Sequence, residues 1–205
     1  MRLVIVDYGV GNLGSILNMF KKIGAAAELS SDAETIAAAD KLVLPGVGAF
    51  DACVSALHER GLVEPLERRV LHDGIPVLGL CVGYQMMTRG SEEGTKAGLG
   101  WIDAWTTRLD TRGDTRLKIP HMGWDIVERV KSHPLTDVLP EEPRFYFVHS
   151  YAVQCADRSD ALLSLSYGGR FDAAAQKDNV MGVQFHPEKS HKYGMALFRN
   201  FVERC

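Results

Sequence analysis

The chain has 205 residues, of which 46% are hydrophobic and 24% are charged, and its formal net charge is −3. These values are typical of a globular protein with a substantial core, and they give no general attraction to nucleic acid or to anionic lipid. No apolar run approaches the roughly 20 residues of a membrane-spanning helix, and the opening apolar run is too short for a signal peptide. The four cysteines lie far apart without a CxxC pair, which argues against a zinc ribbon or a disulfide scaffold and favours a cytoplasmic protein.

Strand and helix patterns alternate over the first 90 residues. Short apolar runs predict buried strands at 3–6, 26–29, 42–44 and 76–80. Apolar residues at helical spacing predict helices at 12–22, 32–38, 50–59 and 62–71, and a further helix begins at 84–88. Ser31 is the expected cap of the second helix, with Glu34 as its capping-box partner. Repeated strand–helix units predict a parallel sheet covered on both faces, with functional loops at the carboxyl ends of its strands.

The second half changes character, because its short strand patterns are separated by Gly, Pro and Asp turns. We expect strands at 101–109, 125–130, 144–153 and 161–167. The runs 171–177 and 180–184 are expected to pair as a hairpin across Asp178-Asn179, and a helix at 195–202 closes the chain. Because there is no linker or internal repeat, residues 1–205 are expected to form one α/β domain. Its mostly parallel, flavodoxin-like sheet is flanked by helices and carries antiparallel strands in the second half.

A Gly-x-Cys-x-Gly turn follows the apolar run 75–78, where the sequence reads Gly79-Leu80-Cys81-Val82-Gly83. A sharp bend between a strand and a helix projects a thiol at the helix N-terminus, where partial positive charge and free N–H groups favour the thiolate. The backbone N–H of Val82 is then half of an oxyanion hole. A cysteine in an apolar segment is also often a small buried hydrophobe, so this pattern alone leaves both interpretations open.

Two further segments fit a cysteine nucleophile. His186-Pro187-Glu188 supplies a general base and a carboxylate that fixes the orientation of its ring. The strand at 42–44 ends in the glycine-rich loop 45–48, which offers a second backbone donor from the Val47–Gly48 region. Taken singly, these segments are also a strand-end histidine beside a solvated glutamate and an ordinary strand-to-helix turn. Together, the three segments predict one site.

Taken in chain order, the loop 45–48, the Gly-x-Cys-x-Gly turn and the distant His-Pro-Glu segment resemble those of the class I, triad-type glutamine amidotransferases. The similarity runs from the first strand to the last helix and is closest to the glutaminase subunits of imidazole glycerol phosphate synthases. The segments that carry this closer similarity are Asp7-Tyr8-Gly9-Val10-Gly11-Asn12, Pro120-His121-Met122-Gly123-Trp124, Tyr146-Phe147-Val148-His149-Ser150-Tyr151 and His186-Pro187-Glu188-Lys189-Ser190.

The resemblance implies hydrolysis of L-glutamine by a triad of Cys81, His186 and Glu188, with no cofactor and no metal. It implies further roles in the oxyanion hole for Val82, Val47 and Gly48, and in substrate binding for Gln85, Glu93 and the backbone at His149, Ser150 and Tyr151. Glu93 also lies in the acidic stretch 91–94, which reads equally well as a solvated loop. We expect a peptide of the loop 45–48 to flip and supply its donor only when a partner is ready.

The resemblance also implies a heterodimer with a cyclase subunit, expected to be a (β/α)₈ barrel. That partner would use the ammonia to make imidazole glycerol phosphate and an aminoimidazole carboxamide ribotide in histidine biosynthesis. The residues expected at the partner interface are Asn12, Pro120, Met122, Trp124, Tyr146 and Lys189. Asp125 stands where the family usually has Asn and is expected to add a charge near this face, and His121 is expected to be structural. Two alternatives stay open: a glutaminase subunit of another synthase, as in vitamin B6 synthesis, and a thiol peptidase-like protein on a similar fold.

Overall fold

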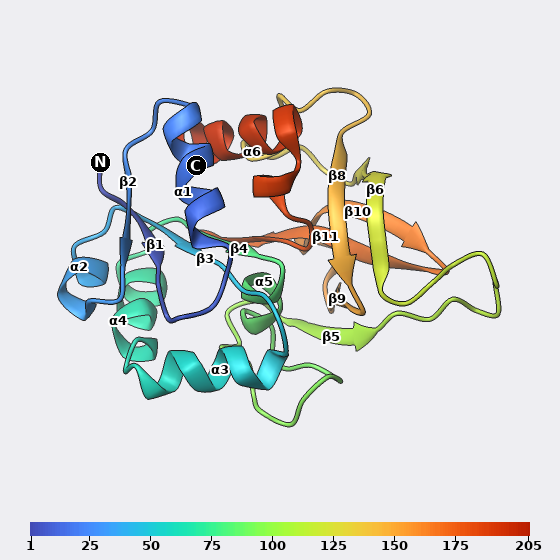
Figure 1. Ribbon diagram of the computed structural model, residues 1–205, viewed down its shortest axis with the longest axis horizontal. Helices are drawn as coiled ribbons and strands as arrows, with labels where there is room; N and C mark the ends of the chain where they lie inside the picture. The colour runs from blue at the N-terminus through green and yellow to red at the C-terminus, as the bar shows by residue number, and fades with distance from the viewer.

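The computed structural model describes residues 1–205 and is built on an eight-stranded sheet (Figure 1). The strand order is β2-β1-β3-β4-β12-β11-β10-β7. The first five strands in that order pair in parallel and the last three join antiparallel. In this order the strands are β2 (Ala27–Ser30), β1 (Leu3–Val6), β3 (Lys41–Leu44), β4 (Val77–Leu80), β12 (Val180–Val183), β11 (Gly169–Lys177), β10 (Ala161–Tyr167) and β7 (Glu128–Arg129). The predicted α/β class, with antiparallel strands in the second half, is confirmed.

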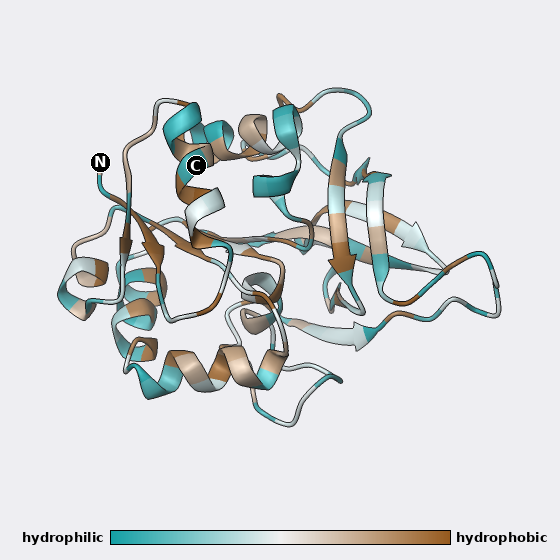
Figure 2. Ribbon diagram, viewed as in Figure 1, coloured by the Kyte–Doolittle hydropathy of each residue, from teal (hydrophilic) through white to brown (hydrophobic).

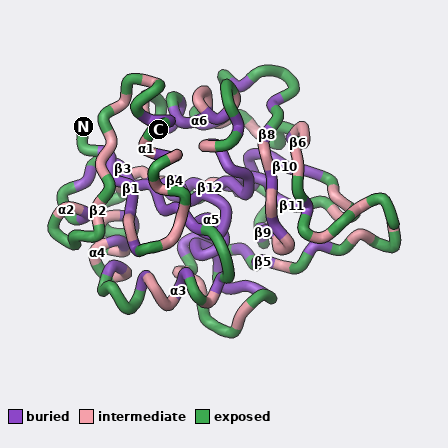
Figure 3. The backbone as a smooth tube through the Cα atoms, viewed as in Figure 1, coloured by how far each residue is buried: buried purple, intermediate pink, exposed green.

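Helices cover both faces of this sheet, and Figure 1 shows α1 and α6 on one side with α3 and α4 on the other. The α-helices are α1 (Leu13–Lys22), α2 (Ala33–Ala37), α3 (Phe50–Glu59), α4 (Val63–Glu67), α5 (Val82–Met86) and α6 (His191–Arg204). Side chains alternate along each strand, so Leu3 and Ile5 pack in the core under α1 and α6, whereas Val4 and Val6 pack in the core under α3 and α4. Two-sided burial explains why β1 is apolar and buried at every position, as Figures 2 and 3 show.

Two short antiparallel ribbons stand beside the large sheet. One pairs β5 (Ala104–Arg108) with β9 (Tyr151–Cys155), and the other pairs β6 (His121–Ile126) with β8 (Arg144–His149). The predicted strand at 144–153 is therefore wrong in one respect, because it divides at Ser150 into two strands with different partners. The prediction at 125–130 placed the start of a strand too late, since β6 begins at His121.

Three other local predictions have clear outcomes. The hairpin at Asp178-Asn179 is confirmed, with Lys177 opposite Val180 and Asp178 at a positive φ of 50°. Ser31 is not the cap of α2; Asp32 takes that place because its carboxylate accepts from the Thr35 N–H at 2.8 Å. The helix predicted at 62–71 is α4 followed by a π-helical turn at Arg68–His72.

Candidate active site

Cys81 occupies a strained turn between β4 and α5. Its φ of 54° and ψ of −112° lie in a region that residues with a Cβ rarely adopt, at a cost of about 1–3 kcal/mol. Its backbone N–H donates to the Val183 carbonyl at 2.8 Å, which ties the turn to β12. The Cys81 side chain is buried and lines the cavity described below. This hydrogen bond therefore fixes the turn at Cys81 to the central sheet.

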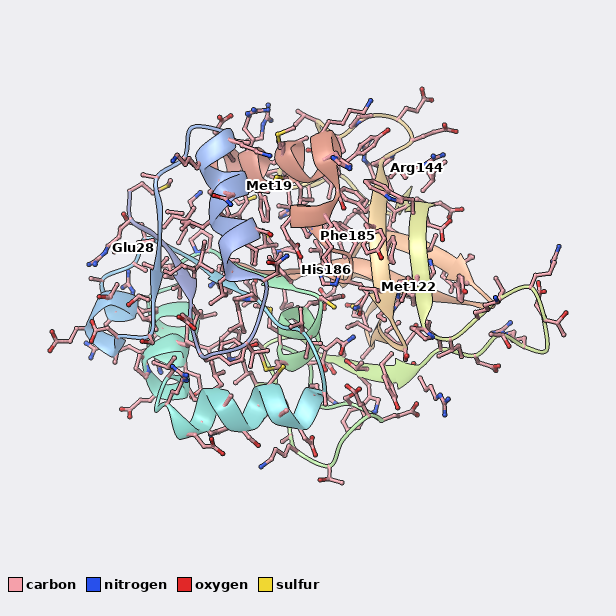
Figure 4. All side chains as sticks on the ribbon, viewed as in Figure 1. Met19, Glu28, Met122, Arg144, Phe185 and His186 are labelled. Atoms are coloured by element: carbon pink, nitrogen blue, oxygen red, sulfur yellow. The ribbon has the colours of Figure 1, made fainter.

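His186 follows β12 and is oriented by Glu188 in the 3₁₀ turn Pro187–Lys189. Its Nδ1 lies 2.8 Å from Oε1 of Glu188, and both side chains are almost fully buried. Burial lowers the pKa of His186, but hydrogen bonding to Cys81 and to Glu188 outweighs burial and raises that pKa to about 9. Figure 4 places His186 near the middle of the molecule. With Nδ1 engaged by Glu188, Nε2 is the nitrogen left for the thiol.

One cavity of about 340 Å³ gathers the residues that the sequence singled out. Its lining contains every residue expected in the nucleophile, base, oxyanion and substrate-binding roles except Glu188, which stands behind His186: Cys81, His186, Val82, Val47, Gly48, Gln85, Glu93, His149, Ser150 and Tyr151. Glu93 accepts a hydrogen bond from the Phe50 N–H at 2.9 Å, so its carboxylate is tied to the start of α3. The polypeptide therefore brings these residues from five separate segments to one place.

The loop at residues 45–48, which we call the oxyanion loop after its expected role, is held by three donors from other parts of the chain. The Tyr8 hydroxyl donates to the Pro45 carbonyl at 2.5 Å, and the Cys53 thiol donates to the Val47 carbonyl at 3.3 Å. Between them, the Val82 N–H donates to the Gly46 carbonyl at 3.3 Å. The expected oxyanion donor at Val82 is thus occupied by the loop itself, and the Gly46–Val47 peptide has its carbonyl directed at that N–H.

Gln184 is a residue of this site to which the sequence interpretation gave no role. Its side chain is fully buried, its Oε1 accepts from Gln85 Nε2 at 3.1 Å, and its Nε2 donates to Cys81 Sγ at 3.8 Å. Gln85 Nε2 also donates to the Tyr151 carbonyl at 3.0 Å. A signal was present in the sequence: Gln184 is a polar residue that directly follows the apolar strand β12 and stands two positions before His186.

A second series of hydrogen bonds, from Asp125 through two histidines, reaches the same Tyr151 carbonyl. Asp125 Oδ2 lies 2.8 Å from His121 Nε2, His121 Nδ1 lies 3.1 Å from His149 Nε2, and His149 Nδ1 lies 2.8 Å from the carbonyl. Burial lowers the pKa of His149 to about 3, so this ring is neutral. The three links need three protons and two neutral rings supply two, so all three links form together only when His121 or Asp125 carries an additional proton.

The residues expected at a partner interface lie around one face of the β6–β8 ribbon. Met122 and Trp124 are exposed to 62% and 39%, the Trp124 ring stacks on His191, and Lys189 Nζ lies 5.7 Å above the Tyr146 ring. Pro120 and Lys189 also line the cavity, whereas Asn12 stands just before α1, which packs against the Pro187–Lys189 turn. Asp125 does not add its charge to this face: alternation along β6 turns it the opposite way, toward His121.

No group of three or more His, Cys, Asp or Glu side chains is placed to hold a metal ion. None of the helices has the length and apolar character needed to cross a membrane.

Comparison with known proteins identifies the family. The family profile "Glutamine amidotransferase class-I" matches residues 4–205. The chain belongs to the class I glutamine amidotransferase family. The resemblance stated from the motifs is therefore confirmed.

Two relatives of this amidotransferase are similar over nearly their full length. "Imidazole glycerol phosphate synthase subunit HisH 2" of Pseudomonas aeruginosa is 52% identical over 98% of each chain. The protein of the same description from Methanococcus maripaludis is 48% identical over 99% of this chain and 100% of its own. Among solved structures, a "glutamine amidotransferase" superposes with a TM-score of 0.76 at 18% identity, covering 98% of this chain and 97% of that one. The last similarity supports the fold alone.

Proposed function

We propose that this amidotransferase is the glutaminase subunit of an imidazole glycerol phosphate synthase and hydrolyses L-glutamine to glutamate and ammonia. The observation that carries the proposal is the meeting of Cys81 with the His186–Glu188 pair in one cavity. Identity of 52% and 48% to two subunits of that synthase supports the assignment over the vitamin B6 and peptidase alternatives.

The chemistry follows from the positions of the three side chains. His186 takes the thiol proton, and the Cys81 sulfur bonds to the side-chain amide carbon of glutamine. The carbon–nitrogen bond then breaks, and His186 returns the proton to the departing ammonia. Water adds to the thioester, releases glutamate and restores the thiol. Glu188 fixes the ring and stabilises its cationic form.

The resting oxyanion loop gives a reason why the subunit needs a partner. The tetrahedral intermediate carries a negative oxygen, whereas the Gly46 carbonyl now occupies the Val82 N–H. Rotation of the Gly46–Val47 peptide would free that donor and bring the Val47 N–H beside it, while Tyr8 and Cys53 keep hold of the flanking carbonyls. Since one missing oxyanion donor costs about 10²–10³ in rate, we propose that partner binding drives this rotation.

The remaining assignments are proposals of the same kind. Gln85 and Glu93 would hold the polar head of glutamine, and the backbone at His149–Tyr151 would hold its carboxylate. The cyclase would dock on Met122, Trp124, Tyr146 and Lys189, with Asn12 and Pro120 beside them, and receive the ammonia for histidine biosynthesis. Free cysteines throughout the chain favour the cytoplasm, and residues 1–205 would act as one domain.

The test measures glutamate release and product formation by the chain mixed with the cyclase and its ribotide substrate. We expect glutamine-dependent synthesis to require both proteins and to vanish in Cys81→Ala. Synthesis from added ammonium salts should survive in the same complex, because the cyclase site is untouched. Retention of glutamine-dependent synthesis by Cys81→Ala, or failure of the cyclase to stimulate glutamate release, would contradict the proposal.

A further inference from the structure

The neighbouring hydrogen-bonding groups allow only one orientation of the Gln184 side-chain amide. The Tyr151 carbonyl can only accept, and Gln85 Nε2 lies 3.0 Å from it, so the Gln85 NH₂ group must face this carbonyl. The same nitrogen lies 3.1 Å from Gln184 Oε1, which fixes the Gln184 oxygen on the Gln85 side. The Gln184 NH₂ group therefore faces Cys81 Sγ, at 3.8 Å.

The backbone around Gln184 makes this donor rigid. Its own N–H donates to the Ala173 carbonyl at 2.8 Å, and the preceding carbonyl, that of Val183, accepts from the Cys81 N–H at 2.8 Å. The side chain is 0% exposed, so water does not compete for the amide. A buried N–H directed at sulfur favours the thiolate over the thiol, because an ionised acceptor strengthens the hydrogen bond.

We propose that Gln184 is a further catalytic residue, whose amide N–H contacts the Cys81 sulfur and stabilises its thiolate form. His186 then supplies the proton transfer and Gln184 supplies a fixed dipole on the same sulfur. The distance of 3.8 Å is long for such a bond, and it is expected to shorten when the sulfur carries a full negative charge. The catalytic part of this role rests on the proposed glutaminase function, whereas the effect on the thiolate does not.

Two substitutions at Gln184 test the effect of its N–H donor separately from the effect of its side-chain volume and of its contact with Gln85. Gln184→Glu keeps the oxygen that Gln85 requires and places a carboxylate oxygen where the donor stood. Gln184→Met keeps the volume and removes both polar groups. Gln154→Met is the matched control, since it makes the same change at a glutamine that donates to the Arg170 carbonyl on another strand.

The decisive measurement is the rate of Cys81 alkylation by iodoacetamide from pH 6 to pH 10, followed by mass spectrometry of the Cys81 peptide in the full-length chain. Cys205, which is partly exposed, serves as an internal reference in every sample. At pH 7 we expect Gln184→Met to react about tenfold more slowly than the parent and Gln184→Glu more slowly still. The rates should approach one another at the alkaline end of this range, because thiols in general ionise more readily there. Urea unfolding of each variant verifies that it is folded.

In the complex with the cyclase, kcat/KM for glutamine should fall about tenfold in Gln184→Met and further in Gln184→Glu. Gln154→Met should match the parent in both assays. Parent-like alkylation of both Gln184 variants at pH 7 would overturn the proposal, as would an equal loss of rate at every pH, which indicates blocked access. If alkylation falls as expected while the parent releases no glutamate, the role at the sulfur stands and the proposed glutaminase function fails.

Discussion

Replacing Glu188 by Gln removes one negative charge beside His186 and leaves the shape of the site unchanged. The amide oxygen can still accept from His186 Nδ1, where Glu188 Oε1 now lies at 2.8 Å. Glu188 Oε2 is buried without a hydrogen-bond partner, so the new NH₂ group is left unpaired in its place. Glu188→Gln therefore tests the negative charge of Glu188 while keeping the oxygen that accepts from His186.

The expected size follows from the pKa of His186. Displacement from 6.5 to about 9 corresponds to roughly 3 kcal/mol, and Cys81 and Glu188 share the part that raises the pKa. If Glu188 supplies about half, its loss lowers the pKa of His186 by about one pH unit. The parent kcat/KM for glutamine, measured with the cyclase, should decline through about pH 9, and the Glu188→Gln curve should decline about one pH unit earlier.

The Glu188→Gln substitution should also change how the stability of the fold depends on pH. Because the folded-state pKa of His186 is raised, the contribution of the protonated ring to stability is complete below about pH 6.5 and is lost as the pH rises through about 9. At pH 7, loss of the charge together with an unpaired buried amide should lower the free energy of unfolding by about 2–4 kcal/mol. The difference in the free energy of unfolding between the parent and Glu188→Gln should be smaller at pH 10, where His186 of the parent is no longer protonated. If kcat/KM for glutamine declines at the same alkaline pH in the parent and in Glu188→Gln, this account of the triad is refuted. The control is Glu203→Gln, which removes a carboxylate at the exposed end of α6.

Two other predictions concern the chains of hydrogen bonds around the site. In Asp125→Asn, the new amide can donate to His121, so all three links between residue 125 and the Tyr151 carbonyl can form with neutral rings. We expect ¹⁵N imidazole spectra to show His121 taking up a proton at acidic pH in the parent but not in the variant. Equal titration of His121 in the two proteins would exclude the link between Asp125 and His121. Burial lowers the pKa of His121 and Asp125 opposes that effect, so the parent should titrate below 6.5. Tyr8→Phe leaves the buried Pro45 carbonyl without its donor, which should cost about 1–3 kcal/mol and lower the unfolding temperature by about 2–4 °C per kcal/mol. An unchanged melting temperature would show that another donor replaces the hydroxyl.

Local sequence was sufficient to predict the elements that carry the nucleophile. The strand β4, the sharp turn and the hairpin between β11 and β12 are each specified within at most about fifteen residues by apolar runs and turn residues. The loop 45–48 and the His186–Glu188 pair follow the same logic, because each sits at the end of a buried strand. Parallel strands bring such ends to one edge, which is why the cavity could be expected before it was seen.

The two ribbons and the state of the oxyanion loop depend on distant parts of the chain. Nothing in residues 144–153 indicates that β8 pairs with β6 and β9 with β5, so the break at Ser150 has no local signal. The loop carbonyls are held by Tyr8, Cys53 and Val82, which come from three separate segments. Such contacts are set by tertiary packing, and a pattern of neighbours in sequence does not contain them.

The glycines around Cys81 show how tertiary packing and chemistry meet in this fold. A Cβ on Gly46 would collide with the backbone nitrogen of Gly83, and one on Gly83 would collide with the Leu44 carbonyl. The loop 45–48 and the start of α5 thus approach each other more closely than any side chain permits, and this approach brings the Gly46 carbonyl onto the Val82 N–H. In the activation proposed above, rotation of the Gly46–Val47 peptide would exchange this blocking carbonyl for a second donor. Because Tyr8 and Cys53 hold the carbonyls on either side of that peptide, the rotation we propose would leave the rest of the loop and the strained turn at Cys81 in place.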